Sequence, residues 1–167
     1  MTVATVLVDL QGDFFAHERL RRNRQLLAAG VNTLVTSARR HGSPIIWVKQ
    51  IHAADLHDAS LEVRGGNHRI VIPGTAGADL LPELYLSQAD SVLIKKRHSA
   101  FFGTNLDAIL DRHSCRTIIV AGVNRAGAAR SYCGPDHARR CPAPPARNVW
   151  ARRSTECRPP RAASWQR

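Results

Sequence analysis

Four short apolar segments constrain the fold of this 167-residue chain more than any other feature. Each has the length of a β-strand and none shows a regular alternation with polar residues, so both faces of each predicted strand are covered. Strands buried on both faces are typical of parallel sheets, whose strands are connected by helices. The sequence therefore predicts an α/β fold with a mainly parallel sheet, built from residues 3–8, 44–48, 91–95 and 117–123.

Helical patterns and one long loop connect these strands. Apolar side chains recur at intervals of three and four over residues 18–41, and the segment HGSP ends this pattern. The segment GTNLDAILDRH predicts a second helix, with Thr104 as its N-terminal cap. Residues 49–77 form a polar stretch whose length favours an active-site loop over a simple connection.

The composition changes sharply after residue 124. Of the 43 residues from 125 to 167, 25 are Arg, Ala or Pro, and Val149 is the only Val, Leu, Ile or Phe. Such a segment buries too little apolar surface to offset its ordering entropy, so we expect it to be mostly irregular. The sequence thus predicts an α/β domain over residues 1–124 and an Arg/Ala/Pro-rich tail over residues 125–167.

The net charge of +11 follows the same division. Residues 1–124 hold 14 basic and 11 acidic residues, whereas residues 125–167 hold 10 arginines and 2 acidic residues. The tail has few aromatic residues and no recognition motif, which disfavours nucleic-acid binding. No apolar run reaches the length of a membrane span, and the N-terminus lacks the basic start of a signal peptide. We therefore expect a cytoplasmic protein without membrane attachment.

Charged residues stand at the carboxyl ends of two predicted strands, where open parallel sheets bind their ligands. Asp9 follows the first strand and Lys95 ends the third. We expect these two strands to be neighbours, so that the Lys95 ammonium lies beside the Asp9 carboxylate. Such a pair is either an acid/base catalyst or a structural ion pair, and the residues alone do not separate the two.

Several longer motifs occur together in one order: VLVDLQGDFF, IPGTAGADLLPEL, LIKKRHSAFFGTNLDAIL and RTIIVAGVN. In this combination, residues 3–124 resemble the isochorismatase-like cysteine hydrolases. That family includes nicotinamidases, N-carbamoylsarcosine amidases, ureido-acid hydrolases and isochorismatases. The resemblance implies a three-layer α/β fold with a six-stranded, mainly parallel sheet. It also implies that the fold is incomplete at the C-terminus, with the last two strands missing or replaced.

The resemblance assigns roles to individual residues. Asp9 is the expected general base, and Lys95 is the expected catalytic lysine in preference to its neighbour Lys96, which points to the other side of the strand. Three further residues are expected to line the substrate pocket, with ordinary core packing as the alternative: Gln11, Phe14 and Phe101.

The expected nucleophile is absent from its position. In amidase members a cysteine follows the fourth strand in a pattern like G-V-x-T-x-x-C-V, and the matching residue here is Ala128. Cys133 lies five residues further on and would need an insertion to take this role. Cys115 precedes the strand, so we expect a buried, small apolar residue there. Loss of the nucleophile predicts an amidase that is inactive or nearly so.

Three functions remain open. The first is hydrolysis of a small amide or ureido compound. The chain would descend from such a hydrolase, and its activity would be impaired because Ala128 replaces the nucleophilic cysteine. The second is isochorismatase-type cleavage of a vinyl ether, in which Asp9 and Lys95 act without a cysteine. The third is non-enzymatic, with the arginine-rich tail binding an acidic partner. The first two functions imply a small-molecule substrate as the partner. Members of the resembled family often form dimers or tetramers, so a homo-oligomer is also an expected possibility.

We predict no cofactor and assign no metal. The nicotinamidase branch of the resembled family binds a divalent ion through an Asp-x-His motif after the second strand. His52, Asp55, His57 and His68 lie in the corresponding region, but the segment DLH comes several residues late. A polar surface loop is therefore the favoured interpretation of these residues.

The abrupt change after Asn124 leads to a hypothesis about the gene. An Arg/Ala/Pro-rich segment is what a GC-rich gene yields when it is read out of frame, so we expect a frameshift near codon 125. Sequencing the genomic locus tests this expectation. An adjacent frame should encode a continuation like T-x-x-C-V, and its absence from both alternative frames would refute the frameshift.

Overall fold

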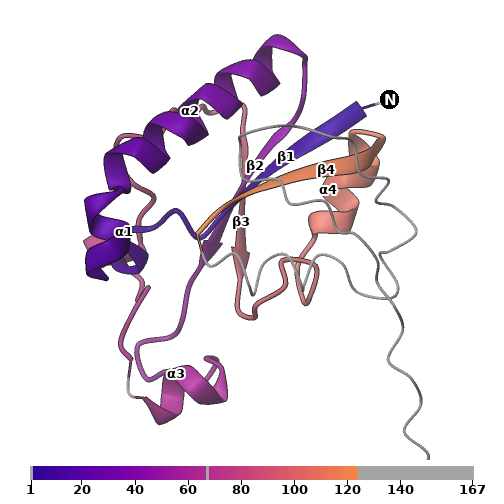
Figure 1. Ribbon diagram of the computed structural model, residues 1–167. Coiled ribbons are helices and arrows are strands. Elements are labelled where there is room, and N and C mark those ends of the chain that lie inside the picture. The colour runs from indigo at the N-terminus through magenta and orange to yellow at the C-terminus, as the bar shows by residue number, and fades with distance from the viewer. Residues whose placement is uncertain (1, 67, 124–167) are drawn as a thin grey trace, which may run out of the picture.

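The computed structural model describes residues 2–66 and 68–123 (Figure 1). These residues contain a parallel sheet with the strand order β3-β2-β1-β4. Its strands are β1 (Thr2–Val8), β2 (Ile45–Gln50), β3 (Ser91–Lys95) and β4 (Cys115–Gly122). All four predicted strands are thus confirmed to within a few residues. Ala128, Cys133 and the tail predicted over residues 125–167 lie outside the described residues.

Helices cover both faces of this sheet, which confirms the predicted α/β architecture. The long helix α2 (Arg24–Arg40) packs on one face and α4 (Leu106–Arg112) packs on the other (Figure 1). The shorter elements are α1 (Glu18–Arg22), α3 (Leu61–Gly65) and two 3-10 turns, η1 (Gly12–Phe15) and η2 (Ala76–Ala78). None of the helices in the described part of the chain has the length and apolar character needed to cross a membrane.

The helix predicted over residues 18–41 is divided at Asn23. The side-chain amide of Asn23 donates to the carbonyl of Arg19 at 2.8 Å. Such local bonds offer the backbone an alternative to the helical ladder, which explains the break between α1 and α2. In the second predicted helix, Thr104 Oγ1 accepts the N–H of Leu106 at 3.2 Å. The N-cap position itself is Asn105, whose side chain makes no cap bond, so Thr104 satisfies a first-turn donor of α4 from the residue before the cap and not from the predicted cap position.

Two apolar clusters attach the helices to the sheet. Leu7 and Trp47 are fully buried against Val35 of α2, whereas Val6 packs with Leu106 on the α4 side. Successive residues of β1 point to opposite faces, and both faces are covered. Full burial of a large aliphatic side chain stabilises the fold by about 1.5–3 kcal/mol. This double burial is why the strands carry no polar face.

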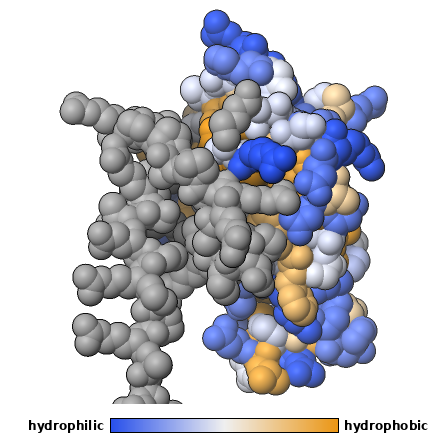
Figure 2. Space-filling model, turned by 90° about the vertical axis from the view of Figure 1, so that its right-hand side faces the viewer, coloured by the Kyte–Doolittle hydropathy of each residue, from blue (hydrophilic) through white to orange (hydrophobic). Residues whose placement is uncertain are grey.

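The two edges of the described sheet, β3 and β4, carry exposed apolar side chains. Val92 and Ile94 on β3 are 52% and 54% exposed, and Ile119 on β4 is 42% exposed. Figure 2 views the molecule from the side of β4 and α4 and shows apolar side chains among hydrophilic ones there. Natural sheets usually protect such edges with a further element, so both edges are the parts of this sheet most open to additional contacts.

The ends of β1 and β4 approach each other closely. Gly122 has a φ of 143°, and a Cβ at this position would lie 2.0 Å from the carbonyl oxygen of Val8. Only glycine fits this approach. The next residue, Val123, donates its N–H to the same carbonyl at 3.2 Å. The chain therefore leaves β4 directly beside Asp9.

Candidate active site

Asp9 follows β1 in a backbone conformation that few residues adopt. Its φ is 58°, in the left-handed region, at a cost of about 1–3 kcal/mol. Strict alternation along β1 would send its side chain to the α2 side together with Leu7. The turn instead brings the carboxylate to the α4 side, where Lys95 follows Leu93. The backbone strain at Asp9 thus places its carboxylate in the site.

The Lys95 ammonium and the Asp9 carboxylate form a buried ion pair. Lys95 Nζ lies 3.2 Å from both carboxylate oxygens and donates a hydrogen bond to Oδ2. The two side chains are only 2% and 4% exposed. The prediction that their strands are neighbours was wrong, because β2 lies between β1 and β3. Two strand spacings amount to about 10 Å, and the long lysine stem reaches across β2.

Burial is the main influence on the acidity of Asp9. It raises the pKa of Asp9 above that of an exposed aspartate, and the charge and hydrogen bond of Lys95 offset part of this rise. The proton is therefore held more tightly than on an exposed carboxyl group. A carboxyl group with this balance is suited to take up a proton and to return it during a reaction.

Gln50, the last residue of β2, lies between the two charged residues. Its Oε1 accepts a hydrogen bond from Lys95 Nζ at 3.1 Å. The side-chain amide of Gln11 binds both main-chain groups of Gln50, accepting from the N–H at 2.7 Å and donating to the carbonyl at 2.9 Å. Gln11 also donates to the carbonyl of Ala78 at 2.7 Å. Gln11, expected to line the pocket, thus extends the β1–β2 pairing beyond the turn at Asp9.

His52 continues this chain of contacts. Its ring is fully buried, and its Nε2 lies 3.1 Å from Nε2 of Gln50. Its Nδ1 is 4.0 Å from Oδ1 of Asp58 and has no hydrogen-bond partner among the described residues. Burial lowers the pKa of His52, although the Asp58 carboxylate acts in the opposite direction. The imidazole is therefore neutral at pH 7.

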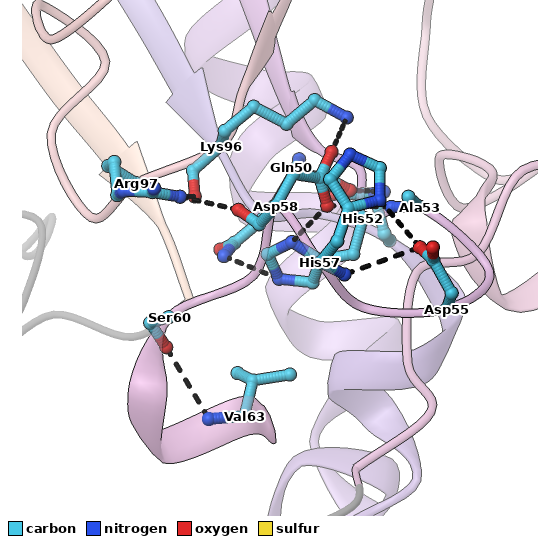
Figure 3. Close-up of polar contacts among 11 residues, drawn as sticks. Gln50, His52, Ala53, Asp55, His57, Asp58, Ser60, Val63, Lys96 and Arg97 are labelled. Carbon is cyan, nitrogen blue, oxygen red and sulfur yellow. Dashed lines mark hydrogen bonds and ion pairs between the residues drawn. The ribbon is translucent and has the colours of Figure 1, made fainter. Parts of the chain in front are cut away.

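Asp58 attaches the loop after β2 to the end of β3 (Figure 3). Its carboxylate lies 2.7 Å from Lys96 Nζ and accepts the N–H of Ala53 at 2.8 Å, while its carbonyl accepts from Arg97. Burial acts to raise the pKa of Asp58, but the bonds from Lys96 and Ala53 lower it to about 2. Lys96 thus belongs to this loop anchor, while Lys95 faces the site.

A second anchor involves Asp13 of η1. Its carboxylate accepts the N–H of Val71 at 2.6 Å, and the carbonyl of Val71 accepts the N–H of His52 at 3.1 Å. Gly77 lies so close that a Cβ there would be 1.9 Å from the Asp13 carboxylate. These contacts bring the loop predicted over residues 49–77 against the carboxyl ends of β1 and β2.

The two phenylalanines expected to line the pocket are both half-buried. Phe14 packs on the apolar cluster beneath α2, and Phe101 packs on the cluster beneath α4. Core packing accounts for these contacts. Cys115 is the first residue of β4 and is buried, as predicted, and burial raises the pKa of its thiol. Ala128, at the expected nucleophile position, lies outside the described residues.

Sequence reasoning did not identify Gln50 and Asp58 as parts of this network. A signal for Gln50 was present, because it continues the alternation of Ile46 and Val48 along β2. A glutamine at the end of such a buried row must satisfy its amide with other polar groups. Asp58 offered no comparable signal, since its partners Lys96 and Arg97 are remote in sequence.

Comparison with known proteins points to one family. The protein-family model described as the isochorismatase domain matches residues 3–128 of this chain. A probable inactive nicotinamidase of Arabidopsis thaliana is 31% identical over 127 residues, which are 72% of this chain and 65% of that protein. The structure of N-carbamoylsarcosine amidase from Thermoplasma acidophilum is 29% identical, with a TM-score of 0.63 over 73% of this chain and 68% of that one.

This chain spans somewhat less than two thirds of its curated relatives. It covers 65% of the nicotinamidase-like protein, and 63% and 64% of two Bacillus subtilis isochorismatase family proteins, YddQ and YaaI. A pyrazinamidase of Pyrococcus horikoshii, solved in complex with zinc, shares the fold at 24% identity, with a TM-score of 0.65 over 78% of each chain.

The residues after β2 do not fit a bound divalent ion. Asp55 and His57 pair with each other at 2.6 Å on the surface, and the Asp58 carboxylate is occupied by Lys96. The Nε2 of His52 is directed at the Gln50 amide. Across residues 2–66 and 68–123, no group of three His, Cys, Asp or Glu side chains is arranged to hold a metal. These contacts occupy Asp55, His57, the Asp58 carboxylate and Nε2 of His52, so these groups as placed do not form a donor set for such an ion.

The Asp58 anchor makes a prediction about stability and pH. A carboxyl group whose pKa is lowered on folding stabilises the protein above its unfolded pKa, and this contribution is lost as the pH falls through the folded value. We expect Asp58→Asn to lower the free energy of unfolding by about 1 kcal/mol at pH 7, with the difference narrowing between about pH 4 and pH 2.

Urea unfolding at several pH values measures this difference. The matched control is Asp107→Asn, an exposed position on α4, whose effect should stay within about 0.5 kcal/mol. If Asp58→Asn lowers the free energy of unfolding by the same amount at pH 2 as at pH 7, the charge-based account of the anchor is contradicted.

Proposed function

The chain belongs to the isochorismatase family, and on that premise we propose that its site descends from a hydrolase of C–N bonds in a small amide or ureido compound. The likeness to N-carbamoylsarcosine amidase, at 29% identity, supports this substrate class. The relative named a probable inactive nicotinamidase supports it as well. We further propose that the present chain is impaired, because Ala128 occupies the nucleophile position.

The observation that carries this proposal is the buried Asp9–Lys95 pair at 3.2 Å. A structural ion pair alone gives no reason for a strained backbone at Asp9, and such strain clusters at functional sites. Burying both charges is also costly and adds little stability compared with apolar residues of similar size. Strain and desolvation together favour an acid/base role for this pair over a purely structural one.

In the amidase reaction Asp9 acts as the base. It takes the proton of a cysteine thiol, and the thiolate attacks the carbonyl carbon to form a tetrahedral intermediate. Asp9 returns the proton to the leaving nitrogen as the C–N bond breaks, and water then hydrolyses the thioester. The Lys95 ammonium balances the charge of Asp9 in the steps where the carboxyl group is ionised. Ala128 has no thiol, so the first step has no nucleophile in this chain.

The elevated pKa of Asp9 favours one second candidate, the hydrolysis of a vinyl ether. In that reaction a protonated carboxyl group donates its proton to the terminal carbon of the enol ether. Water adds to the resulting oxocarbenium ion, and the hemiketal collapses to a ketone and an alcohol. No cysteine takes part. Lys95 Nζ donates its hydrogen bond to Oδ2 of Asp9 and lies in ion-pair contact with Oδ1, so Oδ1 is the oxygen that we assign to the transferred proton.

We predict that Ala128→Cys raises the hydrolysis of at least one small amide or ureido compound by about 100-fold or more, because it supplies the missing nucleophile. Ammonia release from a panel of such compounds measures the gain. Ala126→Cys serves as the matched control, and Asp9→Asn in the Ala128→Cys background should remove the gain.

The same proteins should be assayed for pyruvate release from isochorismate. Release by the unaltered chain that Asp9→Asn abolishes and Ala128→Cys leaves unchanged would favour the vinyl-ether candidate. If Ala128→Cys gains no more than Ala126→Cys on any amide, the proposal that Ala128 accounts for the impairment is contradicted.

A further inference from the structure

A chain of polar contacts runs from Lys95 through Gln50 to His52, and its donor directions follow by exclusion. The Lys95 ammonium has donors only, so the group of Gln50 that lies 3.1 Å from it must be the carbonyl oxygen. The Gln50 NH₂ group therefore faces His52, at 3.1 Å. Because that group is a donor, the facing Nε2 of His52 must accept, and the imidazole proton must be on Nδ1.

The backbone around Gln50 leaves this side chain little freedom. Gln11 binds both the N–H and the carbonyl of Gln50, and the register pairs Gln50 directly with Lys95 across β2 and β3. Neighbouring strands lie about 4.8 Å apart, so the two side chains leave the sheet side by side. The Gln50 amide is thus held over the path that the Lys95 side chain takes toward Asp9.

We propose that Gln50 is a positioning residue that holds the Lys95 ammonium against Asp9, and that His52, in its Nδ1–H form, fixes the direction of the Gln50 amide. The inference rests on the proposed function for its catalytic meaning.

Four charged groups act on His52 from the elements packed around it. Asp58 comes from the loop after β2, while Lys95, Lys96 and Arg97 come from the end of β3 and the residues that follow. Three of these four are cations, and they oppose a positive charge on the ring. Asp58 is the single anion among them, and its carboxylate is paired with Lys96. The surroundings therefore keep the ring neutral, as the contact with Gln50 requires.

Protonation of His52 would disrupt this arrangement. A proton on Nε2 would face the Gln50 NH₂ group, placing two donors 3.1 Å apart. Rotation of the Gln50 amide by half a turn would relieve that contact but would bring its NH₂ group against the Lys95 ammonium. Either outcome weakens the hold on Lys95. The Asp9–Lys95 pair is thereby linked to the protonation state of a residue that does not contact it.

The tautomer of His52 tests this proposal without any turnover, so its failure is distinct from failure of the proposed function. Long-range ¹H–¹⁵N correlation spectra of the ¹⁵N-labelled full chain at pH 7.5 distinguish the Nδ1–H and Nε2–H forms. His52→Asn assigns the signal. We expect the Nδ1–H form to exceed the other by about tenfold, the effect of one well-formed buried hydrogen bond.

Two variants remove the cause of this preference. Gln50→Leu removes the donor that faces the ring, and Lys95→Met removes the ammonium that orients the amide. Each should lower the Nδ1–H to Nε2–H ratio at least threefold, and backbone amide spectra show whether each is folded. Gln25→Leu, at an exposed position on α2, should leave the ratio unchanged.

The Lys95→Met result separates positioning from simple packing, because Lys95 does not contact His52 and the Gln50 amide is the hydrogen-bonded link between them. A dominant Nε2–H form in the unaltered chain would overturn the proposal. An unchanged ratio in whichever of the two variants is folded would overturn it as well.

Discussion

The ion pair between Lys95 and Asp9 is the interaction on which the rest of this site depends. Two charges that are 2% and 4% exposed lose most of their hydration, and their mutual contacts at 3.2 Å do not replace it. The protein surrounds the pair with further polar groups, among them the side-chain oxygen of Gln50 at 3.1 Å from Lys95 Nζ and the main-chain carbonyl of His98 at 3.5 Å. Each of these groups then needs its own partner, and this requirement extends the network outward.

The parallel sheet and the loop after β2 support each other through this network. Parallel strands bring the ends of β1, β2 and β3 to one edge, which places Asp9, Gln50 and Lys95 within reach of one another. The loop adds His52 and is attached to the sheet by Asp58 at one point and by Asp13 at another. A change in the loop is therefore transmitted to the charged pair through side chains and not through the backbone alone.

Much of this arrangement could be predicted from the sequence, because it depends on local patterns. Apolar runs identified the strands, and the polar residues that end them identified Asp9 and Lys95. The strand order could not be read in the same way, so β2 was not expected between the two charged residues. The roles of Gln50 and Asp58 depend on contacts between segments about 40 residues apart, which no spacing rule reveals. The left-handed turn at Asp9 was hidden as well, since aspartate adopts this conformation more readily than most residues but no sequence pattern marks where it does.

The pKa of Asp9, followed by the ¹³C shift of its carboxyl carbon during a pH titration, tests the central claim most directly. A buried acid/base pair predicts a pKa above the value of about 3.9 found for exposed aspartate, with a further rise in Lys95→Met and no comparable rise in Lys96→Met. An Asp9 that titrates near 3.9, and does so equally in both variants, would show that the two groups do not share a buried site.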